Sequence, residues 1–191
     1  MKNKWFIIAV LFPAVIFSQE SSSKSHLNII ATVGMAAGES TAKPLFQLTT
    51  GFTWQHYFTG IGIGYDQNVF NSFPLFADWR MNFGKKQRAF VYADGGYNFP
   101  GSYKKEEQIF KTSDKLIGGF YMDAGIGYRI RLGQSQHLSF SAGYSRKNIA
   151  EKKVFNYPCG INPCDETTDD IYIYHYHFNR FNTKLSWEFG R

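Results

Sequence analysis

The stretch Gly118–Leu132 constrains the fold more than any other part of this 191-residue chain. Its even positions carry the mainly apolar residues Phe120, Met122, Ala124, Ile126, Tyr128 and Ile130. Its odd positions carry Tyr121, Asp123, Gly125, Gly127, Arg129 and Arg131. A period of two indicates a β-strand with one apolar and one polar face. About ten alternating residues are also the length that a tilted strand needs to cross a bilayer.

The polar face of this stretch mixes glycine with charges of both signs. A solvated face more often carries lysine, glutamate and threonine, whereas glycine beside paired charges suits the crowded interior of a narrow barrel. The composition therefore favours a barrel with polar residues inside and apolar residues outside. Alternation alone does not say which face is inside, so a soluble lipocalin-like periplasmic barrel, with the apolar residues inside, is the alternative.

Seven further stretches repeat the alternation, and they are Leu27–Met35, Phe46–Trp54, Gly60–Asp66, Phe73–Phe83, Val91–Phe99, Leu138–Ser145 and Tyr172–Phe189. The last one changes parity, so we expect a β-bulge near Asn179–Arg180. Short connections lie at Gln55–Tyr57, Gly84–Gln87 and Gly133–Gln136, and longer ones at Gly38–Pro44, Gln67–Ser72, Pro100–Lys115 and Asn148–Asp170. This order predicts an all-β fold, an eight-stranded antiparallel up-and-down transmembrane β-barrel.

The N-terminus indicates export. Lys2 and Lys4 precede the apolar run Trp5–Phe17, and Ser18 offers a small residue for cleavage. We therefore expect a signal peptide at residues 1–18 and the barrel domain at residues 19–191, with an ordinary buried N-terminal strand as the alternative. The formal net charge of +6 is scattered and forms no run of lysine and arginine, which argues against binding to nucleic acid.

The export signal, the eight alternating strands and the aromatic terminal stretch Leu185–Phe189 resemble the small outer-membrane β-barrels of Gram-negative bacteria, the OmpA/OmpX/OmpW-like group. The chain departs from their pattern because Gly190 and Arg191 follow the aromatic residue that usually stands last. The resemblance implies a location in the cell outer membrane, with the long loops outside. Aromatic residues near the short-turn rim would then form an interfacial girdle, made of Trp54, Phe83, Tyr128 and Trp187.

The predicted inner face carries a set of charges that we expect to form a lumen charge network, namely Asp78, Arg80, Asp94, Asp123, Arg129, Arg131, Lys184 and Glu188. Counting back from the turn at Gly84–Gln87 places Asp78 opposite Asp94. Two facing carboxylates need a nearby cation, or one of them takes up a proton. Arg80 and Lys184 are the candidate cations, and we expect Arg80 to bridge the two aspartates. The network predicts a salt-bridged, plugged lumen, with a proton or ion path as the alternative.

Two cysteines, Cys159 and Cys164, lie close together in the longest loop, which in an exported chain predicts a local disulfide. No second ligand pair follows at the spacing of a metal site, and the acidic residues of this loop lack an EF-hand spacing. His175 and His177 share one strand face, where polar rim residues are the better interpretation than metal ligands. We therefore expect neither a metal nor another cofactor.

These features predict a monomeric, non-enzymatic outer-membrane protein that is anchored in lipid. Its long loops Pro100–Lys115 and Asn148–Asp170 would carry contacts with an extracellular ligand. One alternative is a narrow, porin-like pore for ions or small solutes. Another is a lipid-modifying enzyme with a Ser/His/acid cluster at the outer rim, although none of the strand serines Ser139, Ser141 and Ser145 carries a nucleophile signature.

Overall fold

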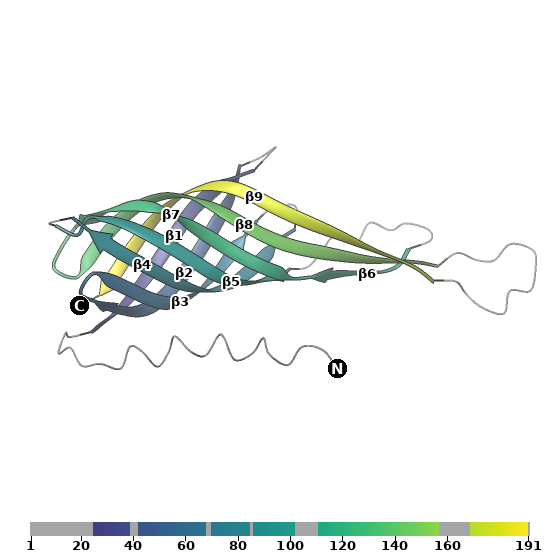
Figure 1. Cartoon of the computed structure of the whole chain (residues 1–191), viewed down its shortest axis with the longest axis horizontal. Helices are drawn as coiled ribbons and strands as arrows, with labels where there is room; N and C mark the ends of the chain where they lie inside the picture. Colours follow the sequence, from purple (N-terminus) through teal and green to yellow (C-terminus); the bar gives the residue numbers. More distant parts are fainter. Residues whose placement is uncertain are drawn as a thin grey trace, which may run out of the picture.

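The structure is a computed structural model that describes residues 25–38, 42–67, 70–84, 86–101, 111–156 and 169–190. The described strands are β1 (His26–Ala37), β2 (Ala42–Trp54), β3 (Tyr57–Asp66), β4 (Ser72–Phe83), β5 (Ala89–Pro100), β6 (Lys111–Ile117), β7 (Gly119–Arg131), β8 (Gln136–Asn156) and β9 (Asp169–Gly190). All strands but β6 close into a barrel in chain order, because β9 pairs with both β8 and β1 (Figure 1). Each pairing is antiparallel, so the predicted eight-stranded up-and-down barrel is confirmed.

The polar face of each barrel strand points inward and the apolar face points outward. In β4, Asp78 and Arg80 are buried, whereas Leu75 and Trp79 are 48% and 42% exposed. Large exposed apolar side chains occur on every strand of the barrel, as a lipid-facing wall requires. The lipocalin-like alternative needs the reverse orientation and is therefore wrong. Among the described residues, no helix is long and apolar enough to cross a membrane.

The two ends of the barrel differ in their connections. The turns after β2, β4 and β7 are short and lie at one rim, together with the C-terminal end of β9 (Figure 1). Gly84 takes a φ of +87° in the β4–β5 turn, a conformation that glycine adopts without steric cost, and the Gln87 amide donates to its carbonyl at 2.9 Å. We call this end the short-turn rim and the opposite end the outer rim.

Bulky side chains fill the lumen at positions where the neighbouring, paired strand carries glycine. A Cβ atom at Gly62 would lie 2.5 Å from the ring of Phe76, and one at Gly127 would overlap the ring of Phe90. Phe76 and Phe90 are 3% and 1% exposed. The inward glycines therefore provide the room that these rings occupy, as expected for a barrel just wide enough for its own side chains.

Strands β8 and β9 continue past the outer rim as a paired extension (right of Figure 1). The pairing of β8 with β7 ends at Tyr121↔Lys147. Beyond it, β6 replaces β7 as the partner of β8, starting at Ile117↔Ala150. We call residues 111–117, 148–156 and 169–177 the ribbon. The prediction of loops at 100–115 and 148–170 is therefore wrong for residues 111–115, 148–156 and 169–170, which form strands. The ribbon encloses no lumen, so nothing there requires one face to be polar, and its sequence does not show the strict alternation of the barrel strands.

The predicted bulge near residues 179–180 is also wrong. The register between β8 and β9 runs unbroken from Gln136↔Phe189 to Asn156↔Asp169. Tyr176 and Phe178 are on the same parity as the buried Arg180, so the inward-pointing face changes from aromatic to polar while its parity stays the same.

Candidate functional site: the charged lumen

The first group of charges lies in the half of the lumen nearest the short-turn rim, and we call it the short-turn cluster: Asp78, Arg80, Arg129 and Glu188. Arg80 donates from Nε and Nη2 to Asp78, with the shortest distance 2.8 Å, and its Nη1 lies 3.6 Å from Glu188. Arg129 pairs with the other Glu188 oxygen at 2.8 Å. Each carboxylate thus faces at least one guanidinium, and the cluster ties β4, β7 and β9 together across the lumen.

The central cluster consists of Asp94, Asp123 and Lys184, and its two aspartates stand in one row with Asp78 across the sheet. Asp78 is registered with Asp94 and Asp94 with Asp123, which confirms the predicted facing of Asp78 and Asp94. Lys184 supplies the cation, with its Nζ 2.8 Å from Asp123 and 3.6 Å from Asp94. Asp123 also accepts hydrogen bonds from the Tyr92 hydroxyl at 3.0 Å, from the Tyr121 hydroxyl at 3.3 Å and from the Asn182 amide at 3.0 Å.

The expectation that Arg80 bridges Asp78 and Asp94 is therefore wrong. Arg80 stands two residues nearer the short-turn rim than Asp78, and there Glu188 of β9 points inward beside it. Lys184 of the same strand lies at the level of the aspartate row, and it is the cation that faces Asp94. Strand parity assigns residues to the lumen, but it does not say which distant strands face each other there.

The outer cluster consists of Asp66, Lys147 and Arg180. Arg180 binds both oxygens of Asp66, with Nη1 at 2.7 Å and Nη2 at 2.5 Å. The Lys147 ammonium lies 3.1 Å from Asp66 and 3.0 Å from the Ser72 hydroxyl, and its side chain is fully buried. Two cations on one carboxylate close the lumen near the outer rim.

Sequence reasoning missed the outer cluster, although its signal was present. Asp66 is the last residue of its alternating stretch, Arg180 stands where a bulge was expected, and Lys147 continues the inward parity just past Ser145. Asp66 and Arg180 already lie within predicted stretches, and extending Leu138–Ser145 by two residues would have added Lys147 on the same parity.

Aromatic residues cover the outer cluster. The ring of Phe178 lies 5.6 Å from the Lys147 ammonium, and the rings of Phe70 and Tyr176 meet edge to face at 5.4 Å. The Tyr176 hydroxyl donates to Glu151 at 3.0 Å, and Glu151 is 2% exposed. The outer mouth of the barrel is thus closed by aromatic side chains above a bidentate ion pair.

The remaining predicted residues lie as follows. Arg131 is exposed at the short-turn rim, where its Nε donates to the Gly133 carbonyl at 2.9 Å, so it is not part of the lumen network. Phe83, Tyr128 and Trp187 are 44%, 47% and 43% exposed on the outer wall near that rim, and Trp54 is half-buried, in ring contact with Tyr57. Cys159, Cys164 and the predicted signal peptide at residues 1–18 lie outside the described residues.

The described side chains form no catalytic triad around the strand serines. Ser139 donates to Glu188 at 3.2 Å, and the buried Ser145 hydroxyl has no hydrogen-bond partner among the described residues. In a Ser/His/acid triad a histidine accepts a hydrogen bond from the serine, and in the described part of the chain none of these serines is bonded to a histidine. The same residues contain no group of three or more His, Cys, Asp or Glu that could hold a metal ion.

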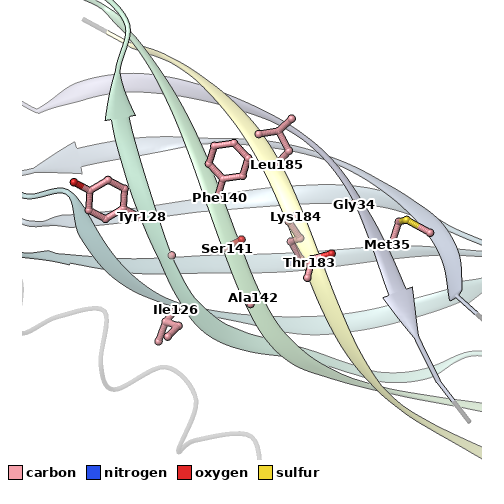
Figure 2. A pocket seen from close by; sticks show the side chains of 11 residues that line it. Gly34, Met35, Ile126, Tyr128, Phe140, Ser141, Ala142, Thr183, Lys184 and Leu185 are labelled. Carbon is pink, nitrogen blue, oxygen red and sulfur yellow. The ribbon is translucent and has the colours of Figure 1, made fainter.

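A groove of about 640 Å³ lies on the wall itself (Figure 2). Its centre is the cross-strand pair Ala142 and Thr183, whose side chains are small, and the larger Ile126, Phe140 and Leu185 stand around it. These side chains belong to the apolar outer face, so acyl chains fill the groove when the barrel is in lipid.

No protein-family model and no curated protein matches the chain. Among solved structures, the chain is similar to the N-terminal β-barrel domain of OprF from Pseudomonas aeruginosa, with a TM-score of 0.56 and 10% identity over 88% of this chain and 99% of that chain. It is also similar to a major outer membrane protein from Thermus thermophilus, with a TM-score of 0.56 and 10% identity over 88% and 100% of the two chains.

The outer membrane protein OprG from Pseudomonas aeruginosa matches with a TM-score of 0.52 and 8% identity, over 88% of this chain and 96% of that chain. At such identities these likenesses concern the fold, which is that of small outer-membrane β-barrels. The resemblance drawn from the sequence is thereby confirmed. The fold and the apolar outer wall together support the predicted location in the cell outer membrane.

Proposed function

We propose that this protein is a non-enzymatic outer-membrane anchor whose ribbon and outer connections make contacts outside the cell. The observation that carries the proposal is the filling of the lumen by three successive ion clusters, with bulky side chains between them. Phe76, Tyr92 and Tyr121 are 3%, 4% and 2% exposed at the level of the aspartate row. A cavity beside Asp66 and Arg180 has a volume of only about 10 Å³, room for about one water molecule.

The ribbon supports the second half of the proposal. Ile171, Tyr172, Ile173 and Tyr174 are 54%, 46%, 54% and 45% exposed, on both faces of a paired strand that projects beyond the barrel. Contiguous exposed apolar surface outside the bilayer is typical of interaction sites. The expected ligand is therefore an extracellular one, held by the ribbon and the connections that join its strands.

Conductance measurements test the anchor against the pore. We expect purified protein in planar bilayers to give no steady conductance, because ion pairs and aromatic rings occupy the lumen at three levels of the described barrel. Substituting Phe76→Ala and Tyr121→Ala together removes two rings from the lumen and should raise the conductance, which shows that the assay detects an opening. Stable ohmic channels from the unchanged protein would overturn the anchor in favour of the pore. Insertion is checked in parallel by heat-modifiable gel mobility.

Thiol labelling on intact cells tests the orientation. Cys159 and Cys164 are the two cysteines of the chain and lie between β8 and β9. We expect a membrane-impermeant maleimide to label them after reduction, and the predicted disulfide to prevent labelling without reductant. A Gln87→Cys variant that lacks both native cysteines is the control, because Gln87 lies at the short-turn rim and should stay unlabelled. Labelling only at that rim would reverse the orientation and contradict the proposal.

A further inference from the structure

The short-turn end of the barrel opens into a basic pocket of about 360 Å³, a volume at the lower end of small-ligand sites. We call it the basic vestibule, and it is lined by Lys86, Gln87, Arg88, Arg129, Arg131 and His137. The β4–β5 turn, the end of β7 and the start of β8 supply these residues. Strand pairing brings them together, since Arg131 is registered with His137 and the Arg129 amide donates to the Arg88 carbonyl at 2.6 Å.

Positive charge in the vestibule exceeds the negative charge around it. Within the described residues, Lys86, Arg88 and Arg131 take part in no salt bridge. The carboxylate beside them is Glu188, and it is already shared between Arg129 at 2.8 Å and Arg80 at 3.6 Å. Like charges gathered without a carboxylate repel one another, and a bound anion would relieve that repulsion.

Arg129 at the floor of the vestibule has an unused donor. Its side chain is 14% exposed, and one end of its guanidinium is held by Glu188. Its Nε is buried and has no hydrogen-bond partner among the described residues. A buried donor without an acceptor is costly, so an acceptor oxygen brought by a ligand would stabilise this arrangement. The planar guanidinium matches the oxygens of a phosphate in both geometry and charge.

We propose that the basic vestibule binds a phosphate group. The lumen is filled behind Arg129 and Glu188, so the ligand enters from the short-turn side, which faces the periplasm in barrels of this kind. The phosphate has two sources with the same chemistry, a soluble phosphate ester or the headgroup of a phospholipid in the adjoining leaflet. This inference goes beyond the proposed function, which concerns the opposite end of the molecule, and it holds or fails separately.

Titration of the folded barrel in a non-ionic detergent with inorganic phosphate tests the proposal. Binding is followed by the ¹⁵N–¹H NMR signals of the arginine Nε groups and by calorimetry, with chloride added to hold the ionic strength constant. We expect saturable shifts of the Arg129 Nε signal. Arg88→Gln and Arg131→Gln should each weaken binding about tenfold, because each removes a charge-assisted hydrogen bond. Both residues are exposed at the rim, so the barrel should fold unchanged.

Lys115→Gln is the matched control, since Lys115 is an exposed cation in β6 at the other end of the molecule. It should leave phosphate binding unchanged. A second arm replaces inorganic phosphate with nanodiscs containing either phosphatidylglycerol or phosphatidylcholine alone. Arginine shifts with inorganic phosphate identify a soluble phosphate as the source, and shifts that need phosphatidylglycerol identify a lipid headgroup. Equal shifts with chloride alone, binding that survives Arg88→Gln with Arg131→Gln, or no binding in either arm would overturn the site.

Discussion

Strands β8 and β9 each pass through two environments, the barrel and the ribbon, and their side chains are sorted differently in the two. Between residues 180 and 189, every inward side chain of β9 is buried and every outward one is exposed. Between residues 171 and 175 of the same strand, all side chains are exposed. The backbone pairing with β8 keeps one register throughout. Sorting therefore comes from the boundary between lipid and lumen, and pairing alone does not produce it.

The two regions also differ in how their charges are held. In the barrel, Lys184 and Arg80 are 6% and 7% exposed and each faces two carboxylates. In the ribbon, the Lys153 side chain is 25% exposed and lies 3.5 Å from the buried Glu151, which keeps the hydrogen bond from Tyr176 when Lys153 is removed. Buried charges with several partners are costly to break, whereas partly exposed pairs contribute little. We therefore expect stability to reside in the barrel, and the following substitutions test that difference from the largest effect to the smallest.

Arg80→Ala should lower the free energy of unfolding by about 3–5 kcal/mol, because it leaves Asp78 buried without its cation. The measurement is urea unfolding of protein refolded into lipid vesicles, followed by tryptophan fluorescence. The double variant Asp78→Ala/Arg80→Ala should lose less than the sum of the two single variants, since neither charge is then left alone. In the ribbon, Lys153→Ala should cost no more than about 1 kcal/mol. Equal losses from Arg80→Ala and Lys153→Ala would remove the distinction between the two regions.

Gly62→Ala tests the packing of the lumen and should cost about 1–3 kcal/mol, because the new Cβ would lie 2.5 Å from the Phe76 ring. Gly95→Ala is the matched control. Gly95 is exposed on the outer wall, with no atom within 4 Å of the position that a Cβ would take. Its substitution should change the unfolding free energy by no more than about 0.5 kcal/mol. A Gly62→Ala barrel as stable as the Gly95→Ala barrel would mean that the lumen has spare room.

The sequence predicts most of the barrel strands, but it predicts only some of the side-chain contacts in the lumen. A strict period of two assigns Asp78, Asp94 and Asp123 to the inner face, and turn positions place the first two opposite each other. The pairing of Arg80 with Glu188 joins β4 to β9, which are not neighbours in the sheet. Such contacts across the lumen depend on strand tilt and stagger, and a local pattern contains neither.

The ribbon was missed for a different reason. Strand β6 pairs with β8 past the barrel, where no lumen imposes an alternating pattern, so its charged sequence resembled a loop. The register shift between Lys111 and Ser113 breaks the little alternation that remains. Charged and aromatic residues in such a segment fit a strand as well as a loop, and only the pairing partner decides between them.

The last test makes the same substitution, isoleucine to serine, once in the barrel and once in the ribbon, where we expect the smaller effect. Ile126 is 66% exposed on the lipid-facing wall, and Ile173 is 54% exposed in the ribbon. Their exposed fractions are similar, but lipid surrounds the first and the proposed surroundings of the second are water. Ile126→Ser should therefore destabilise the inserted barrel by about 1–3 kcal/mol in vesicles, through the lost transfer of an apolar side chain into lipid. Ile173→Ser should change the free energy of unfolding by no more than about 0.5 kcal/mol. The same urea unfolding assay measures both, and a loss at Ile173 as large as that at Ile126 would place the ribbon in the bilayer or against the barrel wall.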